Sequence, residues 1–283
     1  MTRALSVREH DDGADAWRVV TGAPAPMLAG RVTHYADYTE RTGSFVTRRE
    51  LAGTGGVLLI NLGPAIEIVG ADGAVLRVGP GEGFVGGVSE HTSLSRSSGR
   101  QGGVHVFAPL EVLARVVGCP PEAIANRVVA LDALVRDARG LGERLGEAAD
   151  AAARFDLLDG FVAARLSRTA APDRRVTAAA AMLRRAPDTG VAQVAEAVNL
   201  DRRLLARRFG ETWGLSPRRY AQVARFEAFA ALLASDPEAA LADLALAAGY
   251  YDQPHLNRDV RALAGATPAD LRRRLIPGGG GFR

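Results

Sequence analysis

Side chains that hydrogen-bond well to the edges of nucleic-acid bases lie at helical spacing in the last third of the chain. Arg203 and Arg207 are four residues apart, so they share one face of a helix. About 50 residues later stands a second polar group with amide, imidazole and guanidinium side chains: Gln253, His255, Asn257 and Arg258. Arginine can pair with guanine, and glutamine or asparagine with adenine. These residues therefore suit recognition by hydrogen bonds rather than the making and breaking of covalent bonds.

The rest of the sequence indicates no catalytic or metal-binding constellation. Histidines occur at positions 10, 34, 91, 105 and 255, and only His91 and His105 could meet across a barrel. A metal site needs a larger ligand cluster, so we expect no metal and no cofactor, and we expect His91 to be a hydrogen-bonded strand residue. The glycine-rich segments 53–56 and 79–87 lack the lysine of a P-loop and are expected to be turns. Cys119 has no nearby histidine and is expected to be a buried small residue, so we predict that the protein is not an enzyme.

Composition is that of a folded protein with two domains. The chain has 283 residues, of which 47% are hydrophobic and 24% charged. No stretch is long and apolar enough for a membrane span, and the first 15 residues lack the apolar run of a signal peptide. With a single cysteine, the sequence favours a cytoplasmic location and no membrane partner.

Charge is distributed unevenly along the chain. All 35 basic residues are arginine. Residues 1–171 hold 18 arginines and 20 acidic residues, a net charge of −2, whereas residues 172–283 hold 17 arginines and 12 acidic residues, a net charge of +5. A basic C-terminal segment indicates a polyanionic partner.

Residues 16–110 have the pattern of a β-rich domain. Short apolar runs separated by glycine occur at 57–60, 66–69, 75–78, 84–88 and 104–107. Gly70 to Gly73 contain Asp-Gly, which tolerates the positive φ of a tight hairpin turn. This spacing favours a small barrel or sandwich.

The segment from 109 to 171 is expected to be helical. Leu110, Leu113 and Val117 keep a 3.6-residue period, as do Leu131, Leu134 and Val135. Residues 141–166 suggest one or two further helices, and 167–175 form the best linker candidate.

Beyond residue 176 the sequence contains an internal repeat. Val191-Ala192-x-Val194-Ala195 is matched by Leu241-Ala242-x-Leu244-Ala245, an offset of 50. From Asp201 and Asp252 onward the offset is 51, because one extra residue falls in a turn. Two copies of one helical unit are therefore present.

Each copy has the layout of a helix, a tight turn and a second helix. Asn199 or Gly249 closes the first helix in a left-handed conformation, and Asp201 or Asp252 caps the second. Pro254 stands in a first turn, where its missing N–H costs nothing. This is a helix-turn-helix, whose second helix can enter the DNA major groove.

Residues 176–275 resemble the DNA-binding domain of the AraC/XylS family of bacterial transcription regulators. The resemblance rests on Val194-Ala195, the Asp-x-x-x-Leu-x-Arg-x-Phe of 201–209, Gly214 to Pro217, Arg225-Phe226, Ala245, Gly249-Tyr250, Asp252-Gln253 and Thr267-Pro268. It implies two helix-turn-helix units that address successive major-groove faces. A long helix, here roughly 217–234, would join them, with an inward stripe of Phe226, Phe229, Leu232 and Leu233.

The resemblance also implies which side chains face DNA. The expected base-reading residues are Arg203, Ala206, Arg207, Gln253, Pro254, His255, Asn257 and Arg258. The expected phosphate contacts are Arg202, Arg208, Arg218, Arg219 and Arg261. Three residues depart from the family pattern. Pro254 and Leu204 stand where polar residues are frequent, and Asp259 brings an acid beside Arg258, where it would repel phosphate or hold an arginine. We therefore expect the first unit to dominate specificity.

The family pairs this domain with varied sensor domains. The resemblance implies an α+β protein with three segments: a cupin-like β-barrel sensor at 1–110, a helical extension and linker at 111–171, and the all-α DNA-binding domain at 172–283. The expected partners are double-stranded DNA, a small-molecule effector, RNA polymerase and a second copy of the chain. Effector, operator and the sign of regulation stay open.

Two other functions are compatible with parts of the sequence. One is a cupin-type metalloenzyme with a basic helical appendage, which would need the ligand cluster that the histidines do not supply. The other is a repair or methyl-acceptor protein fused to a DNA-binding domain, which would need a reactive cysteine that Cys119 does not provide.

Overall fold

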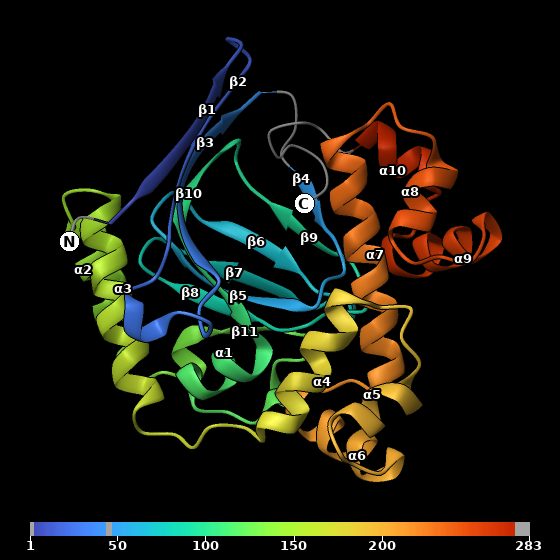
Figure 1. Ribbon diagram of the computed structural model, residues 1–283. Coiled ribbons are helices and arrows are strands. Elements are labelled where there is room, and N and C mark those ends of the chain that lie inside the picture. The colour runs from blue at the N-terminus through green and yellow to red at the C-terminus, as the bar shows by residue number, and fades with distance from the viewer. Residues whose placement is uncertain (1–2, 44–46, 275–283) are drawn as a thin grey trace. The chain divides into compact units, whose positions relative to one another are not determined.

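The computed structural model describes residues 3–43 and 47–274, and these divide into two compact units (Figure 1). The first unit comprises residues up to Arg48, Gly55–Gly87 and Leu94–Ala170. The second comprises Arg49–Thr54, Val88–Ser93 and the chain from Ala171 onward. The outer ends of the segments predicted at 1–110 and 172–283 lie outside the described residues.

The first unit is built on a seven-stranded antiparallel sheet in the order β1-β2-β3-β10-β5-β8-β11. Its strands are β1 (Leu5–Asp11), β2 (Asp15–Gly22), β3 (His34–Thr42), β5 (Gly55–Asn61), β8 (Gly83–Gly86), β10 (Arg100–Pro109) and β11 (Val128–Ala130). The apolar runs predicted at 57–60, 84–88 and 104–107 fall on β5, β8 and β10. β1 and β11 lie outside the predicted β region, because β1 is exposed along its whole length and carries no apolar run.

A second sheet has four strands in the order β4-β9-β6-β7. They are β4 (Thr47–Glu50), β6 (Ile66–Val69), β7 (Val75–Val78) and β9 (Ser93–Arg96). The predicted hairpin is present between β6 and β7, and Gly73 supplies its positive φ of 78°. His91 precedes β9 in an exposed loop, so the prediction that it is a strand residue is wrong.

The core of the first unit lies between the two sheets. The larger sheet contributes buried side chains such as Val19, Tyr38 and Leu59, and the smaller contributes Ile66 and Ile68. The predicted α+β class is confirmed, because the first unit is rich in strands and the second is helical. The described strands pair as two sheets and do not form the closed barrel that was predicted.

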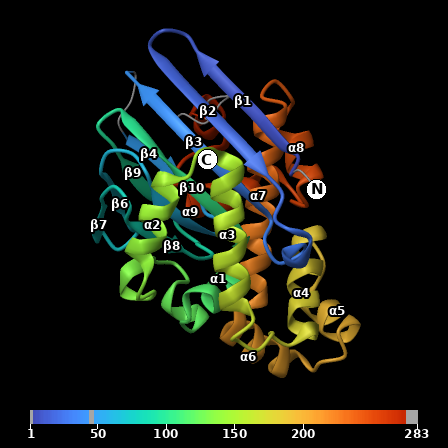
Figure 2. The ribbon, with the colours of Figure 1, turned by 90° about the vertical axis from the view of Figure 1, so that its left-hand side faces the viewer.

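Helices cover the other face of the large sheet (Figure 2). They are α1 (Leu110–Val117), α2 (Ala138–Glu147) and α3 (Ala151–Leu166), with short 3-10 turns at Pro26–Leu28, Pro121–Ala123 and Leu131–Ala133. The helix predicted around Leu131 and Val135 is wrong: Val128–Ala130 pair with β8, and only a single turn follows. Sequence periodicity over five residues cannot distinguish a turn from a helix.

A buried carboxylate ties α3 to the sheet. Asp159 accepts hydrogen bonds from the hydroxyl of Tyr35 at 2.8 Å and from the backbone N–H of Ala25 at 3.0 Å, and it pairs with Arg3. Burial and the neighbouring carboxylate raise the pKa of Tyr35. This contact joins three elements that are far apart in sequence.

The second unit contains the remaining seven described helices. They are α4 (Arg174–Arg185), α5 (Val191–Ala197), α6 (Arg202–Trp213), α7 (Pro217–Ser235), α8 (Leu241–Ala247), α9 (Gln253–Ala264) and α10 (Pro268–Arg274). The joining helix predicted at 217–234 corresponds to α7. Its predicted stripe packs inward: Phe226, Phe229 and Leu233 are fully buried and Leu232 is partly buried.

Three remaining features concern the alternative functions, a metalloenzyme or a methyl-acceptor protein, and a membrane location. Cys119 is half-buried, and burial raises the pKa of its thiol, which keeps the nucleophilic thiolate scarce. Within residues 3–43 and 47–274, no group of three or more His, Cys, Asp or Glu side chains is placed to share a metal ion. None of the helices in these ranges has the length and apolarity needed to cross a bilayer.

Candidate nucleic-acid interface

The first helix-turn-helix unit is formed by α5 and α6. The α5 helix buries Val194 and Ala195, and Asn199 ends it with a φ of 51°, the left-handed conformation predicted from the sequence. Asp201 then caps α6 by accepting hydrogen bonds from the backbone N–H groups of Arg203 and Leu204, both at 2.9 Å. These two devices fix the angle at which α6 leaves the turn.

The α6 helix has one apolar and one polar face. Leu205 and Phe209 are fully buried, and the Phe209 ring packs against Tyr220 of α7 at 5.3 Å between centroids. The predicted base-reading residues of this helix, Arg203, Ala206 and Arg207, are all exposed. The core contacts therefore leave one continuous face of α6 available to a partner.

The second unit repeats this construction with α8 and α9. Gly249 ends α8 in the left-handed region with a φ of 86°, and Asp252 caps α9 by accepting from the backbone N–H of His255 at 2.7 Å. Pro254 stands in the first turn, and Leu256 and Val260 are fully buried. Among the predicted base-reading residues of α9, Gln253, Pro254 and Arg258 are exposed, whereas His255 and Asn257 are half-buried.

Asp259 does not lie where the sequence suggested. Its side chain is 7% exposed and faces α7, so it neither points toward a phosphate backbone nor pairs with Arg258. Its Oδ1 accepts a hydrogen bond of 2.7 Å from Gln222, and the nearest Arg225 nitrogen lies 4.0 Å from its Oδ2. His255 also turns inward: its Nε2 is 3.7 Å from Oδ2 of Asp259, and its ring meets Tyr250 edge-on at 5.1 Å.

The five arginines predicted to contact phosphate are in different environments. Arg202, Arg218 and Arg261 are exposed. Arg208 is half-buried and forms an ion pair with Asp173, the residue that caps α4. Arg219 forms an ion pair with Glu90, which belongs to the same compact unit, and donates to Gln222 at 2.6 Å. Arg208 and Arg219 would have to leave these acids to reach a phosphate.

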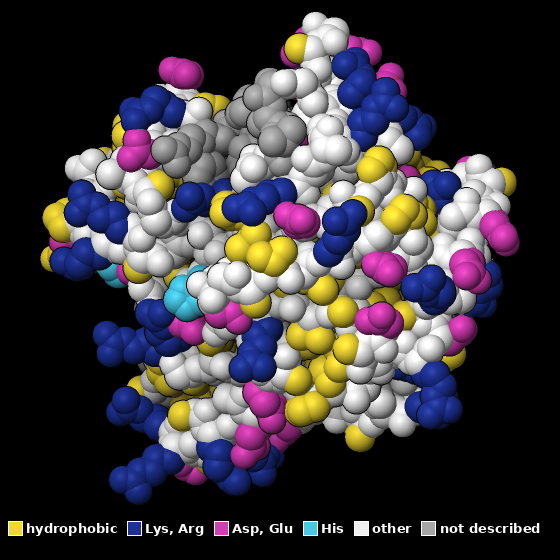
Figure 3. All heavy atoms as spheres, turned by 180° about the vertical axis from the view of Figure 1, so that it is seen from behind, with side chains coloured by type: hydrophobic (Ala, Val, Ile, Leu, Met, Phe, Trp, Pro, Cys, Tyr) yellow, Lys and Arg dark blue, Asp and Glu magenta, His cyan; other side chains and the backbone are white. Residues whose placement is uncertain are grey.

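Arginine side chains project from one face of the second unit. In Figure 3 they project in dark blue along the left-hand edge of the view, over the helices of this unit. Arg184, Arg202 and Arg258 are among its exposed arginines, so these charges face outward. A phosphate backbone is the partner that such a surface attracts.

Sequence reasoning missed the side chains that position these helices. Gln222, Arg225 and Glu90 carry no local motif of their own, and each acts on a residue more than 30 positions away. In the sequence, only its place in the Arg225-Phe226 pair of the family pattern distinguishes Arg225. The sequence offered one signal: Gln222 and Arg225 are polar residues set among the apolar residues of a long predicted helix.

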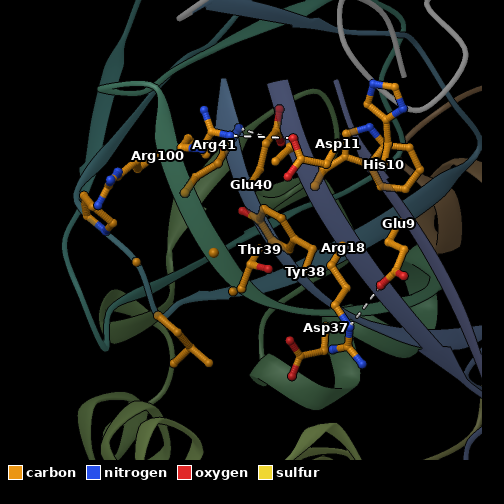
Figure 4. A pocket seen from close by; sticks show the side chains of 18 of the residues that line it. Glu9, His10, Asp11, Arg18, Asp37, Tyr38, Thr39, Glu40, Arg41 and Arg100 are labelled. Atoms are coloured by element: carbon orange, nitrogen blue, oxygen red, sulfur yellow. Dashed lines mark hydrogen bonds and ion pairs between the residues drawn. The ribbon is translucent and has the colours of Figure 1, made fainter. Parts of the chain in front are cut away.

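The first unit contains an open hollow of about 840 Å³ on the large sheet (Figure 4). Its lining carries four arginines and four acids: Arg18, Arg41, Arg100, Arg154, Glu9, Asp11, Asp37 and Glu40. Arg154 is held by Asp37 at 2.6 Å, and Glu40 is engaged by Arg48. The other contacts are looser, since Arg18 is 3.9 Å from Glu9 and Arg41 is 3.8 Å from Asp11.

Two of these arginines stand directly opposite each other. The register pairs Arg41 of β3 with Arg100 of β10, so both side chains point to the same side of the sheet. Arg41 is three positions from the core residue Tyr38, and Arg100 is three positions from Gly103, the partner of Tyr38. An odd offset along a strand reverses the face, so both arginines lie on the face turned away from the core. Like charges at directly opposite positions repel, and an anion between them would relieve that repulsion.

A family model described as a helix-turn-helix domain matches residues 194–274. This match covers both repeats, from the buried face of α5 to the end of α10. Residues 194–274 are an AraC-type helix-turn-helix domain. The AraC-type domain is the DNA-binding part of transcription regulators, and the caps and buried faces described above are its framework.

Two solved structures of ToxT share this fold. ToxT from Vibrio cholerae aligns with 94% of this chain and 100% of its own, at 12% identity and a TM-score of 0.52. ToxT bound to (E)-4-(8-methylnaphthalen-1-yl)but-3-enoic acid aligns with 82% of this chain and 100% of its own, at 10% identity and a TM-score of 0.51. The C-terminal domain of AraT from Geobacillus stearothermophilus aligns with 37% of this chain and 88% of its own, at 24% identity and a TM-score of 0.35. No curated protein matches the chain.

Proposed function

We propose that this protein regulates transcription by laying α6 and α9 in successive major-groove faces of one DNA duplex. The observation that carries the proposal is the exposed face of α6, where Arg203, Ala206 and Arg207 stand opposite a fully buried Leu205 and Phe209. Polar side chains near the N-terminus of such a helix read base edges. The protein would act without catalysis in the cytoplasm, through contact with RNA polymerase or with a second copy of itself.

The two helices contribute unequally to this recognition. The α6 helix presents two exposed arginines, each able to form a bidentate pair with guanine. On α9, the side chains of His255 and Asn257 are half-buried, which leaves Gln253 and Arg258 as its exposed polar readers. We infer that α6 supplies most of the base specificity and that α9 completes the footprint, with Arg202, Arg218 and Arg261 on phosphates.

Selection of binding sites tests this function. The full chain is mixed with a pool of randomised duplexes, the retained duplexes are sequenced, and one of them is footprinted. We expect two protected blocks about one helical turn apart, with the stronger base preference in one block. Retention of all sequences equally, or of none, would show that the chain is not a sequence-specific DNA-binding protein.

We further propose that the hollow of the first unit binds an effector with an acidic group. The support is the directly opposed pair Arg41 and Arg100, whose side chains share the hollow with two loosely paired acids. A carboxylate or phosphate group between the two arginines would gain two charge-assisted hydrogen bonds. The related fold of ToxT holds an organic acid in one of its structures.

Thermal shift measurements with paired ligands test the effector site. Small organic acids are compared with their uncharged methyl esters, and an acid that binds should raise the unfolding temperature while its ester does not. The variants Arg41→Ala and Arg100→Ala should lose the shift. Arg77→Ala removes an exposed arginine from β7, away from the hollow, and should keep it. An acid whose shift survives both hollow variants binds elsewhere.

A further inference from the structure

One arginine in the middle of α7 contacts the loop that leads into the first helix-turn-helix unit and also two elements of the second unit. Nη1 of Arg225 donates a hydrogen bond of 2.8 Å to the backbone carbonyl of Pro187, in the turn that leads into α5. Nη2 of the same guanidinium lies 4.0 Å from Oδ2 of Asp259 on α9. Its central carbon is 5.8 Å from the centre of the Tyr250 ring, in the turn that leads into α9. The Arg225 side chain is only 16% exposed, so these contacts are shielded from water.

The acid on α9 is held by α7 from two positions. Asp259 accepts a hydrogen bond of 2.7 Å from Gln222, one turn before Arg225 on the same helix. Both α7 residues therefore converge on one carboxylate that is almost fully buried. A buried carboxylate is costly unless its partners stay in place. Sliding or rotating α9 along α7 would separate the carboxylate from these partners.

The loop between α4 and α5 and the turn between α8 and α9 also meet beside Arg225. A Cβ added to Gly249 would lie 3.6 Å from Cβ of Asp188 and 3.8 Å from Cδ of Arg225. Asp188 follows Pro187 in the turn before α5, and Gly249 lies in the turn before α9. The loop before α5 and the turn before α9 therefore both pack against the side chain of Arg225.

We propose that Arg225 and Asp259 are positioning residues that fix the separation and rotation of α6 relative to α9, and thereby the half-site spacing that the protein accepts. This inference rests on the proposed function. A duplex offers its major groove on one face once every 34–36 Å or so, and two rigidly connected helices fit only one spacing. Rigid connection also reduces the entropy that binding must overcome.

The spacing dependence of binding tests the proposal. A duplex retained by the full wild-type chain is compared with the same duplex carrying one extra base pair between the protected blocks. The insertion moves the second block by about 3.4 Å and turns it by roughly 35°. We expect wild-type affinity to fall about tenfold or more, the scale of one or more lost base contacts. For Arg225→Ala and Asp259→Asn we expect a much smaller ratio between the two duplexes, because α9 can readjust.

Two controls separate positioning from charge and folding. Arg184→Ala removes an exposed arginine at the end of α4 and should keep the wild-type ratio. Arg225→Lys keeps the charge but lacks the fork that reaches both partners, so it should behave like Arg225→Ala. Wild-type ratios in Arg225→Ala and Asp259→Asn would overturn the proposal, even where both variants bind more weakly overall.

A distance measurement on the protein alone tests the role of Arg225 without any knowledge of the DNA sequence that the protein binds. Nitroxide labels are placed at Glu211→Cys and Ala262→Cys, two exposed positions on α6 and α9, in a Cys119→Ser background. Pulsed electron resonance should give a narrow distance distribution in the parent chain and a broad one in Arg225→Ala. An equally narrow distribution in both chains overturns the inference. Failure to retain any duplex would instead refute the proposed function, while the distance distributions still decide what Arg225 fixes.

Discussion

The carboxylate of Asp201 accepts a 2.9 Å hydrogen bond from the backbone N–H of Leu204, which joins the turn of the first unit to the start of α6. The first N–H groups of a helix have no partner within the helix, so this cap stabilises α6 where it presents Arg203 and Arg207. We predict that Asp201→Ala lowers the free energy of unfolding by about 1 kcal/mol. Urea titration measures the change. Asp201→Asn keeps the acceptor and should lose much less, whereas equal losses in both variants would mean that the charge matters more than the cap.

Binding of the full chain to its selected duplex should weaken steeply with salt. Each arginine that neutralises a phosphate releases a counterion, and log K falls with log salt by about 0.9 for each such contact. With Arg202, Arg218 and Arg261 exposed, we expect a slope of about −3 or steeper. Fluorescence anisotropy at four salt concentrations gives the slope. A value near zero would contradict a phosphate-contacting arginine surface.

Substitution of Arg207 and of Arg218 should have different signatures. We expect Arg207→Ala to cost about 1–3 kcal/mol on the selected duplex and to relax its base preference, because Arg207 lies on the exposed face of α6. Arg218→Ala should weaken selected and scrambled duplexes alike and lower the salt slope by about 1. Anisotropy titrations of both variants on both duplexes provide the comparison. Uniform weakening by Arg207→Ala would make it a phosphate contact instead.

Removal of Glu90 should strengthen binding to any DNA sequence. Glu90 forms an ion pair with Arg219, a residue that the family resemblance places against phosphate. In Glu90→Gln, Arg219 no longer has to leave a carboxylate, and we expect a gain of a few tenths to about 1 kcal/mol on selected and scrambled duplexes. The double variant Glu90→Gln with Arg219→Ala should show no gain over Arg219→Ala alone. A gain that persists in the double variant would mean that Glu90 acts through general repulsion of DNA.

Asp173 should make stability depend on pH in the acid range. Hydrogen bonds from Arg175, and a further one from Arg208, lower the pKa of Asp173 from 3.8 to about 2. A carboxylate with a depressed folded-state pKa stabilises the native state above its unfolded pKa, and this contribution is lost as the pH falls through the folded value. Asp173→Asn should therefore have a lower urea midpoint than the parent at neutral pH. The difference should shrink between about pH 4 and pH 2. A difference that stays constant down to pH 2 would show that the negative charge of Asp173 does not carry its contribution to stability.

The local signals of the helix-turn-helix units were sufficient to predict them from the sequence. Asn199 adopts the left-handed conformation, Asp201 and Asp252 cap their helices, and Pro254 lies in a first turn. Each of these devices acts within a few residues, so its meaning does not depend on the rest of the fold. The same holds for the hairpin at Gly73, where a positive φ is a property of the turn itself.

Strands that exist only because another strand pairs with them were not predictable in this way. The β1 strand is exposed along its length and exists because β2 pairs with it. Residues 128–130 form a strand because β8 lies beside them, although the following residues have a helical period. Strand pairing is a through-space property that a one-dimensional pattern does not contain.

The charge distribution and the internal repeat by themselves determined that residues 172–283 are a basic double helix-turn-helix. Only the tertiary structure decided what each polar side chain of that module faces. Asp259 is adjacent to Arg258 in sequence, yet its carboxylate is buried against Gln222 and near Arg225 of another helix. Residues next to each other on a helix point about 100° apart, so the packing of α9 on α7 determines which one meets DNA and which one meets the core.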